Sequence, residues 1–239
     1  MSDELKTKLI LFTDTHPERI EAYKTLAFGS YNYFEVPPSL DEEIETGLNE
    51  TRKLALKAQE KGTPVALILK ENLKDLPITY ALVNERDGKI LAAGCIKNHE
   101  YLLRRAKQAN QLELVKEIES APTSWGCLEY ICVDEKYRGR HLGIKTLEAL
   151  CSEAEKMGLE NQGLYCAKSE IPFYEKAGMT LACLVDIGGV IRSEHGGNLY
   201  DQKQRHKIVS DGITLGQIID FIDAHETTGL MIKRKRPCC

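Results

Sequence analysis

One stretch limits the fold of this chain of 239 residues more than any other, LEYICVDEKYRGRHLGI at Leu128–Ile144. An apolar run ends at Val133, a turn with Arg138, Gly139 and Arg140 follows, and an amphipathic pattern begins at Leu142. The N–H groups at a helix N-terminus and the positive end of the helix dipole attract anions. The stretch therefore predicts a strand, a phosphate-binding turn and a helix. Its glycine spacing is neither that of a Walker P-loop nor that of GxGxxG.

Strand and helix patterns alternate along most of the chain. We expect strands at 7–13, 78–84, 89–97, 128–133, 163–167, 180–187 and 230–233, and helices at 15–27, 39–62, 101–119, 142–157, 171–177 and 214–224. Asp87-Gly88 lies between two strand patterns and predicts a hairpin with a type I′ turn, in which both residues need positive φ. This order of elements predicts an α/β protein with a mixed sheet.

Two motifs then resemble those of a known family. The run from Val133 to Gly143 is similar to V-x-x-x-Y-R-G-x-G-L-G, the acetyl-CoA-binding motif of the GNAT acetyltransferases, and Phe173–Gly178 (FYEKAG) resembles their second motif. The resemblance covers 77–187 well and 229–236 loosely. It implies the GNAT fold, a mostly antiparallel twisted sheet flanked by helices. The alternative is an ordinary glycine-containing helix start in an α/β protein.

The resemblance also implies how acetyl-CoA, the co-substrate, would bind. Its pyrophosphate would lie on the backbone N–H groups of Arg138, Gly139, Arg140, His141, Leu142 and Gly143. Its pantetheine arm would pair with the backbone of Ile131, Cys132 and Val133, and Ser169 and Lys168 could line the cleft. His141 departs from the family pattern, which has glycine there. Its Cβ could crowd the phosphates, or its imidazole could donate a hydrogen bond to them.

Acetyl transfer to an amine needs a base, because an alkylammonium has a pKa near 10, and a proton donor helps the thiolate to leave. By resemblance, Tyr174 matches the family tyrosine that faces the CoA sulfur; its alternative role is a core aromatic. Glu129 is the candidate base, although strand alternation places Glu129 and Ile131 on one face and Tyr130 and Cys132 on the other. Glu35 loosely resembles a substrate-binding glutamate of arylalkylamine acetyltransferases; its alternative is a surface loop acid.

Composition limits the class and the compartment. With 32 Lys and Arg against 36 Asp and Glu, the net charge of −4 argues against non-specific nucleic-acid binding. No apolar run approaches the roughly 20 residues of a membrane span, and the start MSDELKTK shows no secretory signal. Eight cysteines without CxxC spacing predict buried, reduced thiols, no metal site, and a cytoplasmic or nuclear protein. We interpret the basic end Lys233–Cys239 as a frayed terminus; nuclear import and lipidation are its alternatives.

We therefore expect one acetyltransferase domain over 1–239, with a helical lead-in at 14–62 and insertions at 99–122 and 188–226. The expected reaction is acetyl transfer from acetyl-CoA to a primary amine of a small molecule, an arylalkylamine first, by direct attack in a ternary complex. Glucosamine 6-phosphate and a protein or peptide amine are the alternatives, as is a non-catalytic CoA-binding protein. Whether the chain forms a homodimer stays open.

Overall fold

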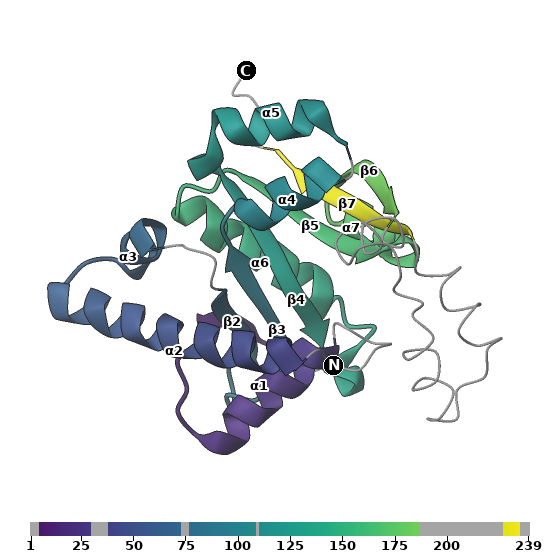
Figure 1. The fold of residues 1–239 in the computed structure, drawn as a ribbon. Coiled ribbons are helices and arrows are strands. Elements are labelled where there is room, and N and C mark those ends of the chain that lie inside the picture. The colour runs from purple at the N-terminus through teal and green to yellow at the C-terminus, as the bar shows by residue number, and fades with distance from the viewer. Residues whose placement is uncertain (1–4, 30–37, 73–76, 109, 187–226, 235–239) are drawn as a thin grey trace.

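The computed structural model describes residues 5–29, 38–72, 77–108, 110–186 and 227–234 (Figure 1). Its centre is a seven-stranded sheet in the order β1-β2-β3-β4-β5-β7-β6. The strands are β1 (Thr7–Leu11), β2 (Ile78–Asn84), β3 (Ile90–Lys97), β4 (Trp125–Val133), β5 (Asn161–Ala167), β6 (Thr180–Asp186) and β7 (Thr227–Lys233). Only β4 and β5 pair in parallel; the other neighbours are antiparallel. The predicted mixed, mostly antiparallel sheet is confirmed.

Helices cover both faces of this sheet. They are α1 (Pro17–Gly29), α2 (Pro38–Lys61), α3 (Val65–Asn72), α4 (Glu100–Gln108), α5 (Leu112–Ser120), α6 (Leu142–Lys156) and α7 (Ile171–Lys176). In Figure 1, α1 and α2 cross in front of the sheet and α6 runs behind it. Side chains of α1 and the first half of α2 form one core cluster with β2, β3 and β4. Those of α6 and α7 form another with β3, β4, β5 and β7, which the second half of α2 and α3 extend.

Two local predictions differ from the structure. The helix expected at 101–119 is two helices, because Asn110 adopts the left-handed conformation (φ 53°) and the Gln111 N–H bonds back to the Ala106 carbonyl, as at many helix ends. The hairpin at Asp87-Gly88 is not type I′. Of these two residues only Gly88 has positive φ, and a longer turn is closed by a bond from the Asn84 N–H to the Lys89 carbonyl. The short helix α3 was not predicted at all.

Some expectations fall outside the described residues: Glu35, the segment 188–226 with its helix at 214–224, and the chain after Arg234. Within the described ranges, six cysteines are free thiols, four of them buried, as the sequence predicted. No helix in the described part combines the length and the apolar character needed to cross a bilayer.

Candidate active site

The sheet opens between β4 and β5. The two strands pair only where Trp125–Cys127 meets Asn161–Gly163. Beyond that point β4 continues to pair with β3, and β5 pairs with β7. Across the described residues, therefore, no ladder pair joins the second half of β4 to β5. The β5-facing edge of Ile131–Val133 presents backbone N–H and C=O groups of the kind that bind an extended ligand as an added strand.

A bulge in β4 lies three residues beyond its last pair with β5, Cys127–Gly163. Two β4 residues, Tyr130 and Ile131, stand opposite the single β3 residue Gly94, as the register shift shows. Tyr130 has φ 56°, a conformation rare for a bulky side chain and typical of a local irregularity. The extra residue places Glu129 and Tyr130 together on the α1–α2 face, while Ile131 packs against the core below α6. The prediction that Glu129 and Ile131 share a face is wrong for this reason.

Lys97, the last residue of β3, joins the charged groups on that face. Its Nζ lies 2.5 Å from Oε2 of Glu129 and also forms an ion pair with Glu43 of α2. The Tyr130 hydroxyl donates to the same Glu43 oxygen at 2.6 Å and accepts from Lys97 at 3.3 Å. The Lys97 and Glu129 side chains are 8% and 11% exposed, whereas Glu43 is 36% exposed. We call Lys97, Glu43, Glu129 and Tyr130 the Lys97 cluster.

The electrostatics of the Lys97 cluster keep its lysine charged. Burial alone would lower the pKa of Lys97, but the carboxylates of Glu129 and Glu43 outweigh it and raise that pKa. The thiols of Cys95 and Cys127 lie beside the cluster, and burial, then the Glu129 charge, raise the pKa of both. They therefore stay protonated and are poor nucleophiles. With two carboxylates and one ammonium, the cluster carries a formal charge of −1.

The predicted phosphate-binding turn follows β4 directly. The first backbone bond of α6 runs from the Lys145 N–H to the His141 carbonyl at 3.1 Å, so the N–H groups of residues 142–144 precede it at the helix N-terminus. Gly139 has φ 76°, and nothing lies within 4 Å of a Cβ built there. His141, the N-cap, also holds a left-handed conformation (φ 60°, ψ 13°). Its backbone thus adopts a conformation that favours glycine, and its side chain is exposed.

Positive charge surrounds the turn. The Arg140 guanidinium carbon lies 5.6 Å from the Tyr137 ring centroid, and Lys89 Nζ lies 4.8 Å from the same centroid. Arg138 lies near the Cys132 thiol, whose pKa burial raises and Arg138 lowers. Backbone donors and exposed cations therefore coincide at one end of the opening between β4 and β5. These residues fit a pyrophosphate.

The two sequence motifs touch through Gly143 and Phe173. A Cβ at Gly143 would lie 3.0 Å from Cζ and 3.3 Å from Cε2 of Phe173. Glycine at this position lets α6 and α7 pack closely. The Phe173 ring also meets the Tyr174 ring edge-on, with centroids 5.0 Å apart. Phe173 thus lies between the N-terminus of α6 and the Tyr174 ring.

Tyr174 is buried beside the opening. Its hydroxyl interacts electrostatically with the thiols of Cys166 on β5 and Cys132 on β4, the two strands that have separated there. Burial, followed by the charge of Glu170, raises the pKa of Tyr174 well above 10. The phenol is therefore protonated at physiological pH, so it can donate a proton but cannot serve as a base.

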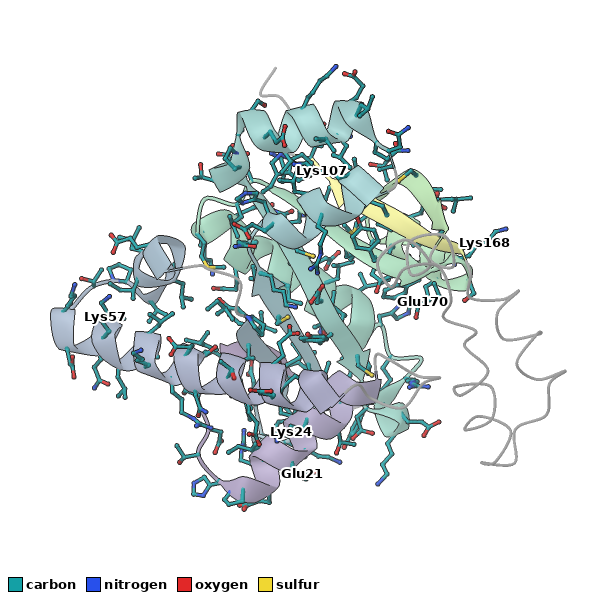
Figure 2. The ribbon with its side chains drawn as sticks, in the orientation of Figure 1. Glu21, Lys24, Lys57, Lys107, Lys168 and Glu170 are labelled. Atoms are coloured by element: carbon teal, nitrogen blue, oxygen red, sulfur yellow. The ribbon has the colours of Figure 1, made fainter. Side chains whose placement is uncertain are left out.

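The position of Ser169, the remaining predicted CoA-binding residue, gives little evidence about its role. Ser169 is exposed in the turn Lys168–Glu170 that follows β5, where Glu170 accepts a bond from the Ala167 N–H at 3.2 Å. Figure 2 shows the side chains of Lys168 and Glu170 at this end of β5. Contact of Ser169 with CoA stays a prediction. In the part of the chain that the structure describes, no group of three or more His, Cys, Asp or Glu side chains could hold a metal ion.

The sequence pattern did not indicate which residues contact Glu129. Lys97, Glu43 and Tyr130 were not singled out, although one signal was present. Lys97 ends a strand whose residues are all buried, and a buried lysine needs a counter-ion. That signal predicts an acidic partner without identifying it.

A mostly antiparallel sheet that opens beside the N-terminus of α6 has the architecture that the resemblance to CoA-dependent acetyltransferases implied. The sequence model of the acetyltransferase (GNAT) family matches residues 35–179, more than half of the chain. The chain belongs to this family.

The individual relatives found by comparison share limited sequence identity with this chain. The glucosamine 6-phosphate N-acetyltransferase of Arabidopsis thaliana is 31% identical over 103 residues, which are 43% of this chain and 58% of the relative. The chain therefore matches less than two thirds of the length of that curated relative. Among solved structures, a protein proposed to be a phosphinothricin N-acetyltransferase has a TM-score of 0.53 at 13% identity, with 97% of this chain and 100% of the other covered; this likeness supports the fold. The crystal structure of the Arabidopsis thaliana enzyme has a TM-score of 0.43 at 20% identity, covering 74% of this chain and 94% of its own.

Proposed function

We propose that the protein transfers the acetyl group of acetyl-CoA to a primary amine of a small molecule, by direct attack in a ternary complex. The observation that carries this proposal is the separation of β4 from β5 immediately before the phosphate-binding turn. A pantetheine arm paired with Ile131–Val133 would lead from the pyrophosphate at 138–143 to the bulge at Tyr130. The thioester would then lie between Tyr174 and the Lys97 cluster.

The residues on each side of the opening suit the two proton transfers. A bound ammonium must lose a proton before its nitrogen can attack the thioester carbonyl, and carboxylates of the Lys97 cluster, Glu129 among them, can accept it. When the carbon–sulfur bond breaks, Tyr174 holds a proton that it can give to the thiolate, although burial, by raising its pKa, also makes the phenol a weaker acid. No cysteine nucleophile is needed for direct attack.

Glucosamine 6-phosphate is the acceptor we propose first. A specific observation favours it, the 31% identity to a protein named glucosamine 6-phosphate N-acetyltransferase. The arylalkylamine hypothesis rested on Glu35, which lies outside the described residues, and it stays a second candidate. Its support is the formal charge of −1 on the Lys97 cluster, which favours a cationic amine. A peptide amine is third.

The test measures acetyl-CoA binding and turnover separately. Thermal unfolding with and without acetyl-CoA reports binding, and release of free CoA thiol reports transfer to each acceptor of a panel. The panel pairs glucosamine 6-phosphate with glucosamine, and adds phenylethylamine and a lysine peptide. We expect stabilisation by acetyl-CoA and thiol release that is fastest with glucosamine 6-phosphate. Stabilisation without thiol release on any acceptor would support a CoA-binding protein instead, and no stabilisation would contradict both.

A further inference from the structure

We propose that Glu43 of α2 is the carboxylate that takes the proton from the acceptor's ammonium, and that Lys97 is the residue that positions it. This assignment rests on the proposed N-acetyltransferase function. The resemblance suggested Glu129 as the base, whereas the geometry of the Lys97 cluster favours the neighbouring carboxylate of Glu43.

Exposure separates the two carboxylates. A base must reach the incoming ammonium and afterwards return its proton to water. Both carboxylates contact the Lys97 ammonium, but the Glu129 side chain is only 11% exposed. The Glu43 side chain is 36% exposed and lies on a helix that covers the same face. Of the two, only Glu43 combines a place in the cluster with ready access to solvent.

Tyr130 connects Glu43 to the bulge. Its hydroxyl donates to Glu43 Oε1 at 2.6 Å, and its backbone forms the bulge in the part of β4 that no longer pairs with β5. The carboxylate is therefore tied to the backbone segment beside which the thioester would lie. A base held this way needs no large movement to meet an amine attacking there.

The Lys97 ammonium compensates the charge of one of the two carboxylates, so the Lys97 cluster keeps one negative charge that can attract a cation. Without its ammonium, Glu43 and Glu129 would repel each other on a half-buried surface. Burial keeps the neighbouring thiols of Cys95 and Cys127 neutral, and on the same face Lys24 of α1, labelled in Figure 2, forms an ion pair with Glu45. An entering ammonium would bring the Lys97 cluster to a formal charge of zero.

The proposed step balances in protons. The acceptor R–NH3+ gives one proton to the Glu43 carboxylate and becomes R–NH2. Its nitrogen forms a bond to the thioester carbonyl carbon, the carbon–sulfur bond breaks, and the thiolate receives the proton of Tyr174. The nitrogen's second proton passes through solvent to Tyr174, and Glu43 releases its proton to water. The net products are R–NH–CO–CH3, CoA–SH and one proton.

The experiment compares Glu43→Gln with Glu42→Gln, an exposed carboxylate on the same helix. With the acceptor that supports the fastest thiol release, we expect Glu43→Gln to lower kcat/KM for the amine about 100-fold or more. KM for acetyl-CoA should stay within about twofold, and Glu42→Gln should match the parent protein. Glu43→Asp keeps the charge and should recover part of the rate.

The pH profile separates a base from a structural residue. The Glu43→Gln variant can use only acceptor that is already neutral, so its deficit should shrink about tenfold per pH unit as pH approaches the pKa of the acceptor's ammonium. A deficit that is the same at all pH values, or a variant as active as Glu42→Gln, would overturn the assignment while the parent's thiol release still supported the proposed function. A parent protein that is stabilised by acetyl-CoA but releases no thiol would overturn both.

Lys97 is tested with Lys97→Arg, which keeps the positive charge and changes its shape. We expect kcat to fall about tenfold with KM for acetyl-CoA unchanged, because a bulkier guanidinium cannot hold both carboxylates in the same geometry. Unchanged kcat in a variant that still binds acetyl-CoA would show that Lys97 does not position the base.

Discussion

Replacing Tyr174 with phenylalanine removes one oxygen atom from a buried side chain and changes little else. Tyr174 is 7% exposed and packs within the core below α6. A phenylalanine ring fills the same space, so the free energy of unfolding should change by no more than about 1 kcal/mol. The acetyl-CoA contacts proposed for the turn at 138–143 and for the edge of β4 are backbone groups. Binding of acetyl-CoA should therefore be unaffected.

The expected loss is in turnover. A positioned general acid typically contributes 10²–10⁴-fold, and a factor of about 100 corresponds to about 2.7 kcal/mol of barrier. We therefore expect Tyr174→Phe to lower kcat at least about 100-fold in the thiol-release assay, while acetyl-CoA raises the Tm as in the parent. Tyr165→Phe is the matched control, because Tyr165 lies on β5 but packs with the cluster under α4 and α5. Equal kcat for Tyr174→Phe and the parent would refute the proposed role.

The pH dependence gives an independent check. Burial raises the pKa of Tyr174 above its usual value of 10, so the phenol stays protonated through the alkaline part of an ordinary assay. The donor form should thus persist to at least about pH 9.5, and no loss of kcat below that pH should be traceable to Tyr174. A fall in kcat centred below pH 9 that disappears in Tyr174→Phe would contradict the burial argument.

Three further substitutions test the turn and the Lys97 cluster. His141→Gly should raise the free energy of unfolding, measured by chemical denaturation, by up to about 1 kcal/mol, since the left-handed N-cap conformation strains histidine more than glycine. A fall in acetyl-CoA affinity would show instead that the imidazole donates a hydrogen bond to the phosphates. Gly143→Ala should lower the free energy of unfolding by about 1–2 kcal/mol and should also lower kcat, because the added Cβ would lie 3.0 Å from Phe173. Unchanged stability and kcat would mean that Phe173 moves aside freely. Glu129→Gln should lower the free energy of unfolding by about 2 kcal/mol, because it breaks the buried ion pair with Lys97. It should slow turnover less than Glu43→Gln does. A larger fall in turnover than that of Glu43→Gln would return the role of base to Glu129.

The sequence predicted those parts of the site that are local in the chain. The strand, turn and helix at 128–144 are adjacent residues whose pattern reports a backbone geometry directly, and all three were found. The Lys97 cluster is different, because its contacts join residues 54 and 87 positions apart. Periodicity describes one element at a time, so it predicted a strand that ends at Lys97 but not which carboxylate would contact this lysine.

The error about Glu129 has one cause, a single inserted residue in β4. Alternation assumes that every residue of a strand advances the side chain by half a turn, and the bulge at Tyr130 breaks that rule by placing two residues opposite one. A regular strand would have directed Tyr130 away from α2 and left Glu43 without its link to β4. The same irregularity lies in the part of β4 that no longer pairs with β5, three residues beyond the last pair at Cys127. Local rules often fail at functional sites because function selects a geometry that those rules disfavour, and in this chain the positive φ of Tyr130 marks that position.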